Sequence, residues 1–150
     1  MNRVLNHVAV HVPDVDVAVE FYTSIFGFRK LKNLPRCTTR REEPDAPVFR
    51  VYDERLQKVK VSFLTTGNSV GFELFQFIDP PMSVPASFDY TRGGVFHIAV
   101  TDNDPEEICR KVIAAGGKKI GATVVPASAA KDGHRECTLY CADPWGNTIG

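Results

Sequence analysis

The chain has 150 residues, 43% of them hydrophobic, and its 18 Lys and Arg residues balance its 18 Asp and Glu residues. This length suits one globular domain or two small halves that share a core, and a formal net charge of zero argues against a nucleic-acid partner. No apolar run approaches the roughly 18 residues of a membrane span and the start lacks a signal-peptide layout, so we expect a cytoplasmic protein without a membrane partner.

The first predicted strand covers residues 4–12, which are rich in Val and alternate in polarity. Asp14 follows in the position of a helix N-cap, and Gly27 supplies a left-handed stop. Between them the apolar residues recur at helical spacing and predict one buried stripe: Val15, Ala18, Tyr22 and Ile25.

The rest of the first half predicts strands at residues 28–34, 58–66 and 70–78. The polar, Pro-bearing segment 35–57 is expected to be a long inserted loop with a short element near Val48 to Tyr52. We expect module one to cover about 1–80, a proline-containing linker about 80–92, and module two about 93–150.

The second half repeats the first at an offset of 90 residues, which aligns His7 with His97 and Asp14 with Asp104. Asp104, Pro105 and Glu107 predict an N-cap, a first helical position and a capping box. Strands are then expected at 118–125, at 134–142 and from 147, with the last strand apparently incomplete. Each half therefore predicts a β-α-β-β-β order, and the fold class is α+β.

The repeated histidine lies on the strand face that points away from the helices, because strand residues alternate between faces. His7, Ala9 and His11 share this face in the first copy, and His97 has the same place in the second. A histidine followed by a small residue is unlike a packed core face, so we expect the two faces to line a cavity.

Glu73 adds a carboxylate to a strand that is otherwise apolar, and it shares a face with Phe75 and Phe77. A carboxylate in such a strand needs a cation, a hydrogen-bond donor or a metal. Together with His7 and His97 it forms a ligand set typical of Zn, Fe, Ni or Mn. Salt-bridged or solvated roles for the three residues are the alternative.

The chain resembles the vicinal oxygen chelate superfamily, which includes glyoxalase I, extradiol dioxygenases and the fosfomycin- and bleomycin-resistance proteins. The resemblance rests on "LNHVAVHVPDVDVAVEFYTSIFGF", "FELFQF", "VFHIAVTDNDPEEICRKVIAAGG" and "DPWGNTI". It implies two β-α-β-β-β modules whose mixed sheets curl around a central cavity and a divalent metal, with helices outside. The family's four metal positions fall on His7, Glu73, His97 and Gly150, and the last of these is normally a Glu.

The resemblance implies a metal-dependent enzyme that chelates vicinal oxygens of a small-molecule substrate. The resemblance favours isomerase or lyase chemistry over a dioxygenase, because extradiol dioxygenases take their carboxylate ligand from the last strand and here it is Glu73, in the middle of the chain. A metal-free binding protein is the third alternative. Gly150 in place of Glu predicts low glutathione-dependent lyase activity. Family members commonly pair modules across chains, and we expect a homodimer.

His11 and Tyr140 are the candidate catalytic residues. We expect His11 about 6–7 Å along the strand from His7, where it could act as an acid or base. Tyr140 enters the cavity if the alternate residues of its strand, Leu139 and Cys141, face the helices.

Two further groups have both functional and structural readings. Three arginines of the insertion could reach an anion or form a solvated charge cluster: Arg36, Arg40 and Arg41. The four cysteines contain no C-x-x-C pair, so we expect free thiols.

Overall fold

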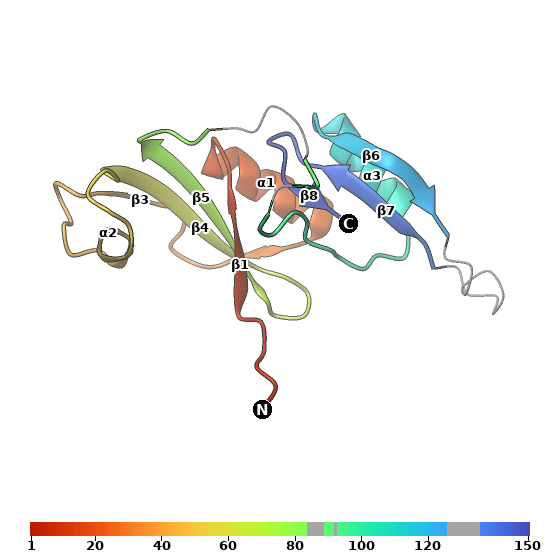
Figure 1. Cartoon of the computed structure of the whole chain (residues 1–150), viewed down its shortest axis with the longest axis horizontal. Helices are drawn as coiled ribbons and strands as arrows, with labels where there is room; N and C mark the ends of the chain where they lie inside the picture. The colour runs from red at the N-terminus through yellow and green to blue at the C-terminus, as the bar shows by residue number, and fades with distance from the viewer. Residues whose placement is uncertain (84–88, 92, 126–135) are drawn as a thin grey trace. The chain divides into compact units, whose positions relative to one another are not determined.

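The computed structural model describes residues 1–83, 89–91, 93–125 and 136–150, and the chain divides into two compact units, 1–83 and 84–150. The first unit contains β1 (His7–His11), α1 (Val15–Phe26), β2 (Arg29–Lys30), β3 (Arg36–Thr39), α2 (Pro47–Val51), β4 (Lys58–Thr65) and β5 (Gly71–Asp79). The second contains α3 (Pro105–Ala114), β6 (Lys118–Val124), β7 (Thr138–Ala142) and β8 (Thr148–Ile149) (Figure 1). The predicted α+β class is confirmed. None of the described helices is long and apolar enough to cross a bilayer.

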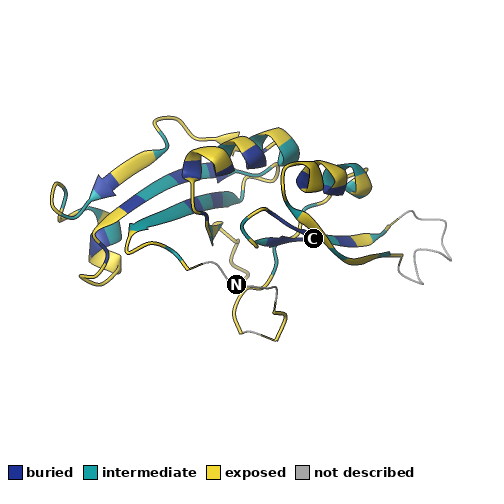
Figure 2. Cartoon of the chain, turned by 90° about the horizontal axis from the view of Figure 1, so that it is seen from above, coloured by how far each residue is buried: buried dark blue, intermediate teal, exposed yellow. Residues whose placement is uncertain are grey.

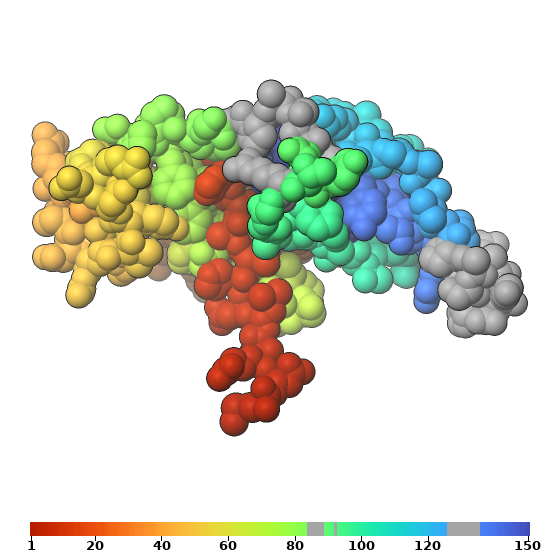
Figure 3. All heavy atoms as spheres, in the orientation of Figure 1, coloured from red at the N-terminus to blue at the C-terminus, as the bar shows by residue number. Residues whose placement is uncertain are grey.

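The sheet of the first unit has the order β1-β5-β4-β2, and β3 also pairs with β4. β1 runs parallel to β5, with Val8 opposite Phe72 and His11 opposite Phe75, whereas β4 is antiparallel to its neighbours. The residues that precede β1 extend away from this sheet (Figures 1 and 3). β1 and β5 are therefore neighbours although more than 60 residues of sequence separate them.

α1 forms as its capping residues predict. The Asp14 carboxylate accepts from the backbone N–H groups of Asp16 and Val17 at 2.9 and 3.2 Å, and Gly27 ends the helix with a φ of 67°. The buried positions of α1 lie against the strands (Figure 2), where the Tyr22 ring is 4.7 Å from that of Phe72. The face of the sheet that carries Phe72 is thus the helix-covered face.

The short element expected near Val48 to Tyr52 is α2, and the insertion also contains β3, which the sequence did not predict. The Arg40 guanidinium holds this segment together by donating to four backbone carbonyls, those of Leu56, Phe49, Tyr52 and Asp53, at 2.7–3.4 Å. It also lies 4.8 Å from the centre of the Phe49 ring. A guanidinium is suited to this task because its donors form a rigid fork.

The Arg40-bound segment packs on the face of the sheet opposite α1. Phe49 and Leu56 form a small core with Val59, and Phe75 and Phe77 are packed against it. Because alternate residues of β5 point to opposite faces, Phe75 and Phe77 share a face with Glu73 and not with Phe72. The insertion therefore covers one end of the face that carries Glu73.

The second unit has a sheet of order β6-β7-β8, and residues 97–100 join it beside β8. The expected strand at residues 134–142 starts within 126–135, outside the described residues, and β7 itself begins at Thr138. The thiol of Cys141 in β7 is buried at 3% exposure, and this burial raises its pKa to about 11. Leu139 and Cys141 are buried on the side of β7 that α3 covers.

Asp104 is the N-cap of α3, and its carboxylate accepts from the Glu107 N–H at 3.0 Å. The expected capping box is wrong in its second half, because the Asp104 N–H donates to Asp102 at 2.7 Å and the Glu107 carboxylate pairs with Arg110. Asp102 therefore accepts from the Asp104 N–H, which in a capping box would donate to the Glu107 carboxylate.

The turn between β7 and β8 is built around the buried Asp143. Its carboxylate accepts from the N–H of Trp145 at 3.0 Å and from the backbone and side-chain N–H groups of Asn147, both at 2.8 Å. Gly146 has a φ of 96°, which favours glycine. The turn directs β8 back beside β7 and brings residues 148–150 next to residues 97–100.

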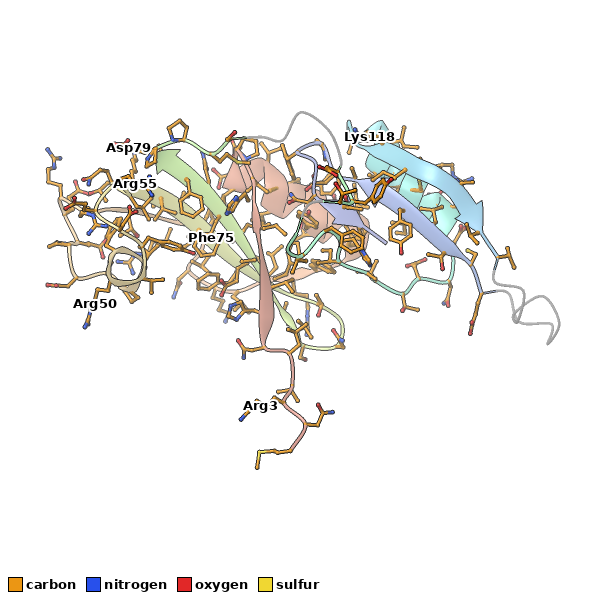
Figure 4. All side chains as sticks on the ribbon, viewed as in Figure 1. Arg3, Arg50, Arg55, Phe75, Asp79 and Lys118 are labelled. Carbon is orange, nitrogen blue, oxygen red and sulfur yellow. The ribbon has the colours of Figure 1, made fainter. Side chains whose placement is uncertain are left out.

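Replacing Arg40 by Met should lower the free energy of unfolding by about 1–3 kcal/mol, because several carbonyl groups lose a charged donor at once. Arg50→Met is the matched control: Arg50 extends outward from α2 (Figure 4) and should change stability by less than about 0.5 kcal/mol. Urea unfolding measures both. Equal stability of the two variants would contradict the role given to Arg40.

Candidate functional site

His7 and Glu73 come together on the face of the first sheet opposite α1. The distance from His7 Nε2 to Glu73 Oε2 is 3.9 Å, with side-chain exposures of 48% and 22%. This distance is too long for a hydrogen bond. The distance is within ion-pair range for a protonated His7, which is the salt-bridged alternative. Two ligand atoms about 2.0–2.2 Å from one tetrahedral ion are about 3.4 Å apart, so the pair would share a metal after a small approach of the two side chains.

Asn6 fixes the other nitrogen of His7. The His7 Nδ1–H donates to Asn6 Oδ1 at 2.7 Å, because an amide oxygen can only accept. Nε2 is then the unprotonated nitrogen of the neutral ring, and it is the atom that faces Glu73. Such a partner is what orients metal-binding histidines in proteins. Sequence reasoning missed Asn6, although its place directly before His7 was the available signal.

His11 lies farther from His7 than expected. The two are four residues apart in one strand, which corresponds to about 13 Å, so the expected 6–7 Å is wrong. His11 is closer to Glu73, because Ala9 pairs with Glu73 and His11 pairs with Phe75, only two residues farther along β5. The catalytic role of His11 stays a prediction.

Aromatic rings line the face beyond Glu73. The Phe75 ring, labelled in Figure 4, stacks on the Phe77 ring with 5.8 Å between ring centres. The Phe77 ring also makes T-shaped contacts with the rings of His11, at 5.1 Å between centres, and Tyr52, at 5.8 Å. Tyr52 belongs to the insertion and is 46% exposed. Residues from β1, β5 and the insertion thus form one aromatic wall.

The three arginines of the insertion have structural partners. Arg36 pairs with Glu43, Arg41 lies 3.7 Å from Glu42, and Arg40 binds the carbonyl groups described above. The structural reading of this cluster is therefore favoured over the anion-binding one.

The second unit carries His97 and Tyr140 on the face of its sheet opposite α3. Their ring centres are 5.2 Å apart at an interplanar angle of 81°, and the Phe96 ring lies 4.5 Å from His97. Nδ1 of His97 is buried and has no hydrogen-bond partner among the described residues. A buried nitrogen without a partner costs free energy, and a metal ion is one group that would satisfy it.

Gly150 occupies the position in the second unit that Glu73 has in the first. Ile98 pairs in parallel with Ile149 as Val8 pairs with Phe72, so the next residue along is Gly150 in one unit and Glu73 in the other. Gly150 is fixed there by bonds from its N–H to the Ile98 carbonyl at 2.7 Å and from the Val100 N–H to its carbonyl at 2.8 Å. The second unit has no carboxylate at this position.

Among the described residues, the structure brings no group of three or more His, Cys, Asp or Glu side chains together in an arrangement that could hold a metal ion. The first unit supplies one imidazole and one carboxylate, and the second supplies one imidazole.

The sequence of residues 4–150 matches the family model of the Glyoxalase/Bleomycin resistance protein/Dioxygenase superfamily. A 2-epi-5-epi-valiolone epimerase from Actinomyces sp. is 26% identical over 152 residues, covering 95% of this chain and 74% of that protein. The share covered shows that the similarity spans both units.

Solved structures share the fold. A glyoxalase family protein from Bacillus cereus has a TM-score of 0.73 and 19% identity, covering 99% of this chain and 93% of that one. The fosfomycin resistance protein FosX from Listeria monocytogenes, in complex with Mn(II) and sulfate, has a TM-score of 0.58 and 13% identity, covering 99% and 90%.

Replacing Asn6 by Ala should convert the single His7 tautomer into a mixture, because the acceptor for Nδ1–H is lost. Long-range proton–nitrogen NMR of the metal-free protein measures the tautomer directly. Asn2→Ala, at an exposed position, is the control and should leave it unchanged. If His7 keeps the same tautomer in Asn6→Ala, Asn6 does not orient it.

Proposed function

The chain belongs to the Glyoxalase/Bleomycin resistance protein/Dioxygenase superfamily, and from this premise we propose that it is a metal-dependent isomerase of the epimerase type. The observation that carries the proposal is the pair of His7 Nε2 and Glu73 Oε2, 3.9 Å apart and facing each other without a hydrogen bond. With Asn6 Oδ1 accepting from Nδ1–H, Nε2 is the nitrogen of His7 that is left to bind a metal.

The proposed ligands are His7, Glu73 and His97. One carboxylate with two imidazoles suits Zn, Ni, Fe or Mn, and a bound ion of this kind supplies Lewis-acid stabilisation of negative charge on oxygen. His97 would come from the second unit of the same chain or from that of a partner chain, and a homodimer remains part of the proposal. The Mn(II) in the FosX structure supports a divalent metal in this fold.

The proposed substrate is a small molecule with two neighbouring oxygens and a hydrocarbon part. The oxygens would lie at the end of the face that carries His7 and Glu73, and the hydrocarbon part against Phe75 and Phe77. Aromatic faces bind apolar groups and exclude water. The 26% identity to a 2-epi-5-epi-valiolone epimerase supports inversion at a carbon as the reaction.

Epimerisation next to a carbonyl requires a base that removes a proton from one face of the carbon and an acid that delivers a proton to the other face. We propose His11 as the base, because it lies on the same face and two residues along from the residue paired with Glu73, and a water molecule as the proton donor on the opposite face. A substrate whose oxygens lie near Glu73 would extend its carbon skeleton toward His11 and Phe77. Glu73 itself would be occupied as a ligand.

Glu73→Gln, His7→Ala and His97→Ala should each weaken the binding of Mn(II), Ni(II) or Zn(II) by about tenfold or more, since each removes a ligand or its charge. Isothermal titration calorimetry on the metal-free protein measures this, with thermal unfolding to check the fold. His11→Gln is the matched histidine control and should bind metal as the wild type does. If Glu73→Gln, His7→Ala and His97→Ala all bind metal as tightly as the His11→Gln control, the proposed ligand set is wrong.

The metal-loaded protein should incorporate deuterium from D₂O at the carbon next to the carbonyl of a cyclic α-hydroxy ketone, which has two neighbouring oxygens and a hydrocarbon part. His11→Gln should slow this exchange by about 10²–10⁴-fold while keeping the metal, because it removes the proton-transfer group. Proton NMR follows the exchange. Undiminished exchange in His11→Gln would assign the base elsewhere, and rapid glutathione-dependent turnover of methylglyoxal would favour lyase chemistry instead.

A further inference from the structure

The ring of Tyr140 lies directly over Gly150. A Cβ atom placed on Gly150 would be 2.8 Å from Tyr140 Cε1, which is closer than non-bonded carbons approach, and 3.2 Å from Cδ1, which is tighter than an ordinary van der Waals contact. Gly150 has little freedom to move away, because its N–H and its carbonyl are both bonded to residues 98–100. A side chain at position 150 therefore requires Tyr140 to move.

The same tyrosine ring contacts His97 edge to face, at 5.2 Å and 81°. The residue before the repeated histidine differs between the units. In the first unit Asn6 orients His7 by a hydrogen bond. In the second unit this residue is Phe96, and the centre of its ring lies 4.5 Å from that of His97. No described polar group holds His97 Nδ1. The orientation of His97 thus depends on the rings beside it.

We infer that Tyr140 is a positioning residue that fixes the imidazole of His97 and fills the space that a carboxylate side chain at position 150 would need. Of the two proposed ligand positions in the second unit, His97 then offers a metal one nitrogen and position 150 offers no side-chain carboxylate. The second unit has Phe96 where the first has Asn6, and Gly150 where the first has Glu73. Tyr140 links these two differences, because its ring contacts His97 and lies over Gly150.

The consequence for the substrate rests on the proposed metal-dependent function. A divalent ion held by one carboxylate keeps a net charge of about +1, whereas two carboxylates would neutralise it. Such a site favours a pair of oxygens that carries negative charge, as in an α-hydroxy carboxylate or a deprotonated α-hydroxy ketone, over a neutral diol. Oxalate is a simple probe of this class.

The first test is a double-mutant cycle on the metal-free protein, so its outcome is independent of the proposed function. Gly150→Ala should lower the Tm by about 3–8 °C, because the added methyl group meets Tyr140. In a Tyr140→Ala background the same change should have little effect, and the double variant should fold. Additive effects of the two substitutions would overturn the inference.

The second test follows the His97 ring by NMR in the metal-free protein. Tyr140→Phe keeps the ring and should leave the His97 chemical shifts near those of the wild type, whereas Tyr140→Ala should remove the ring-current shift. In metal titrations, Tyr140→Ala should weaken affinity about tenfold and Tyr140→Phe should restore it. Tyr90→Ala, at a tyrosine that is 74% exposed, is the control, and an equal effect of Tyr90→Ala and Tyr140→Ala would contradict a positioning role.

The third test compares oxalate binding to two metal-loaded double variants, Tyr140→Ala with Gly150→Glu and Tyr140→Ala with Gly150→Ala. The variant with the added carboxylate should bind oxalate about tenfold more weakly, because it neutralises the ion. Equal oxalate affinities would overturn the substrate class. If none of the proteins binds metal, the proposed function fails, and the stability cycle and the NMR measurement still decide the role of Tyr140.

Discussion

The parallel pairing of β1 with β5 is the constraint on which the proposed site depends. It places Val8 opposite Phe72 and Ala9 opposite Glu73, and because strand residues alternate between faces, His7 and Glu73 are left on the face that α1 does not cover. A shift of one residue would turn Glu73 toward the helix and bring Phe72 out. The buried contact between Tyr22 and Phe72 opposes that shift, so the apolar core on one face determines where the polar pair lies on the other.

The second unit uses the same parallel pairing with different residues. Ile98 and Ile149 reproduce the register of Val8 and Phe72, but the polar pair becomes His97 with Tyr140 above Gly150. The repeat thus preserves the backbone and the histidine while it changes the partner from a carboxylate to an aromatic ring. The first unit therefore carries a charged residue and a histidine oriented by a hydrogen bond, and the second carries a histidine oriented by packing.

Local signals in the sequence were sufficient for several features. The cap of α1 at Asp14, its stop at Gly27 and the separation of Glu73 from Phe72 follow from side-chain chemistry and strand alternation within a few residues. The equivalence of Glu73 and Gly150 also followed from the repeat, since both units pair their outer strands in the same register.

Features that depend on distant or competing partners were not predictable in the same way. The insertion was expected to be a loop with one short element near Val48 to Tyr52. The bonds of Arg40 that hold it together were not predictable because its carbonyl partners lie 9–16 residues away, beyond the reach of helix or strand periodicity. The capping box at Glu107 was wrong because Asp102 competes for the same backbone donor. The contact between Tyr140 and His97 joins residues 43 positions apart, and only the pairing of β7 with β8 brings them together.

X-ray absorption spectroscopy at the metal edge of the Mn- or Zn-loaded protein is the most direct measurement of the central claim. The account predicts a first shell of two imidazole nitrogens and one carboxylate oxygen from the protein, completed by solvent oxygens, with one imidazole lost in His7→Ala and one in His97→Ala. A shell with no imidazole, or one that is unchanged in both variants, would contradict it.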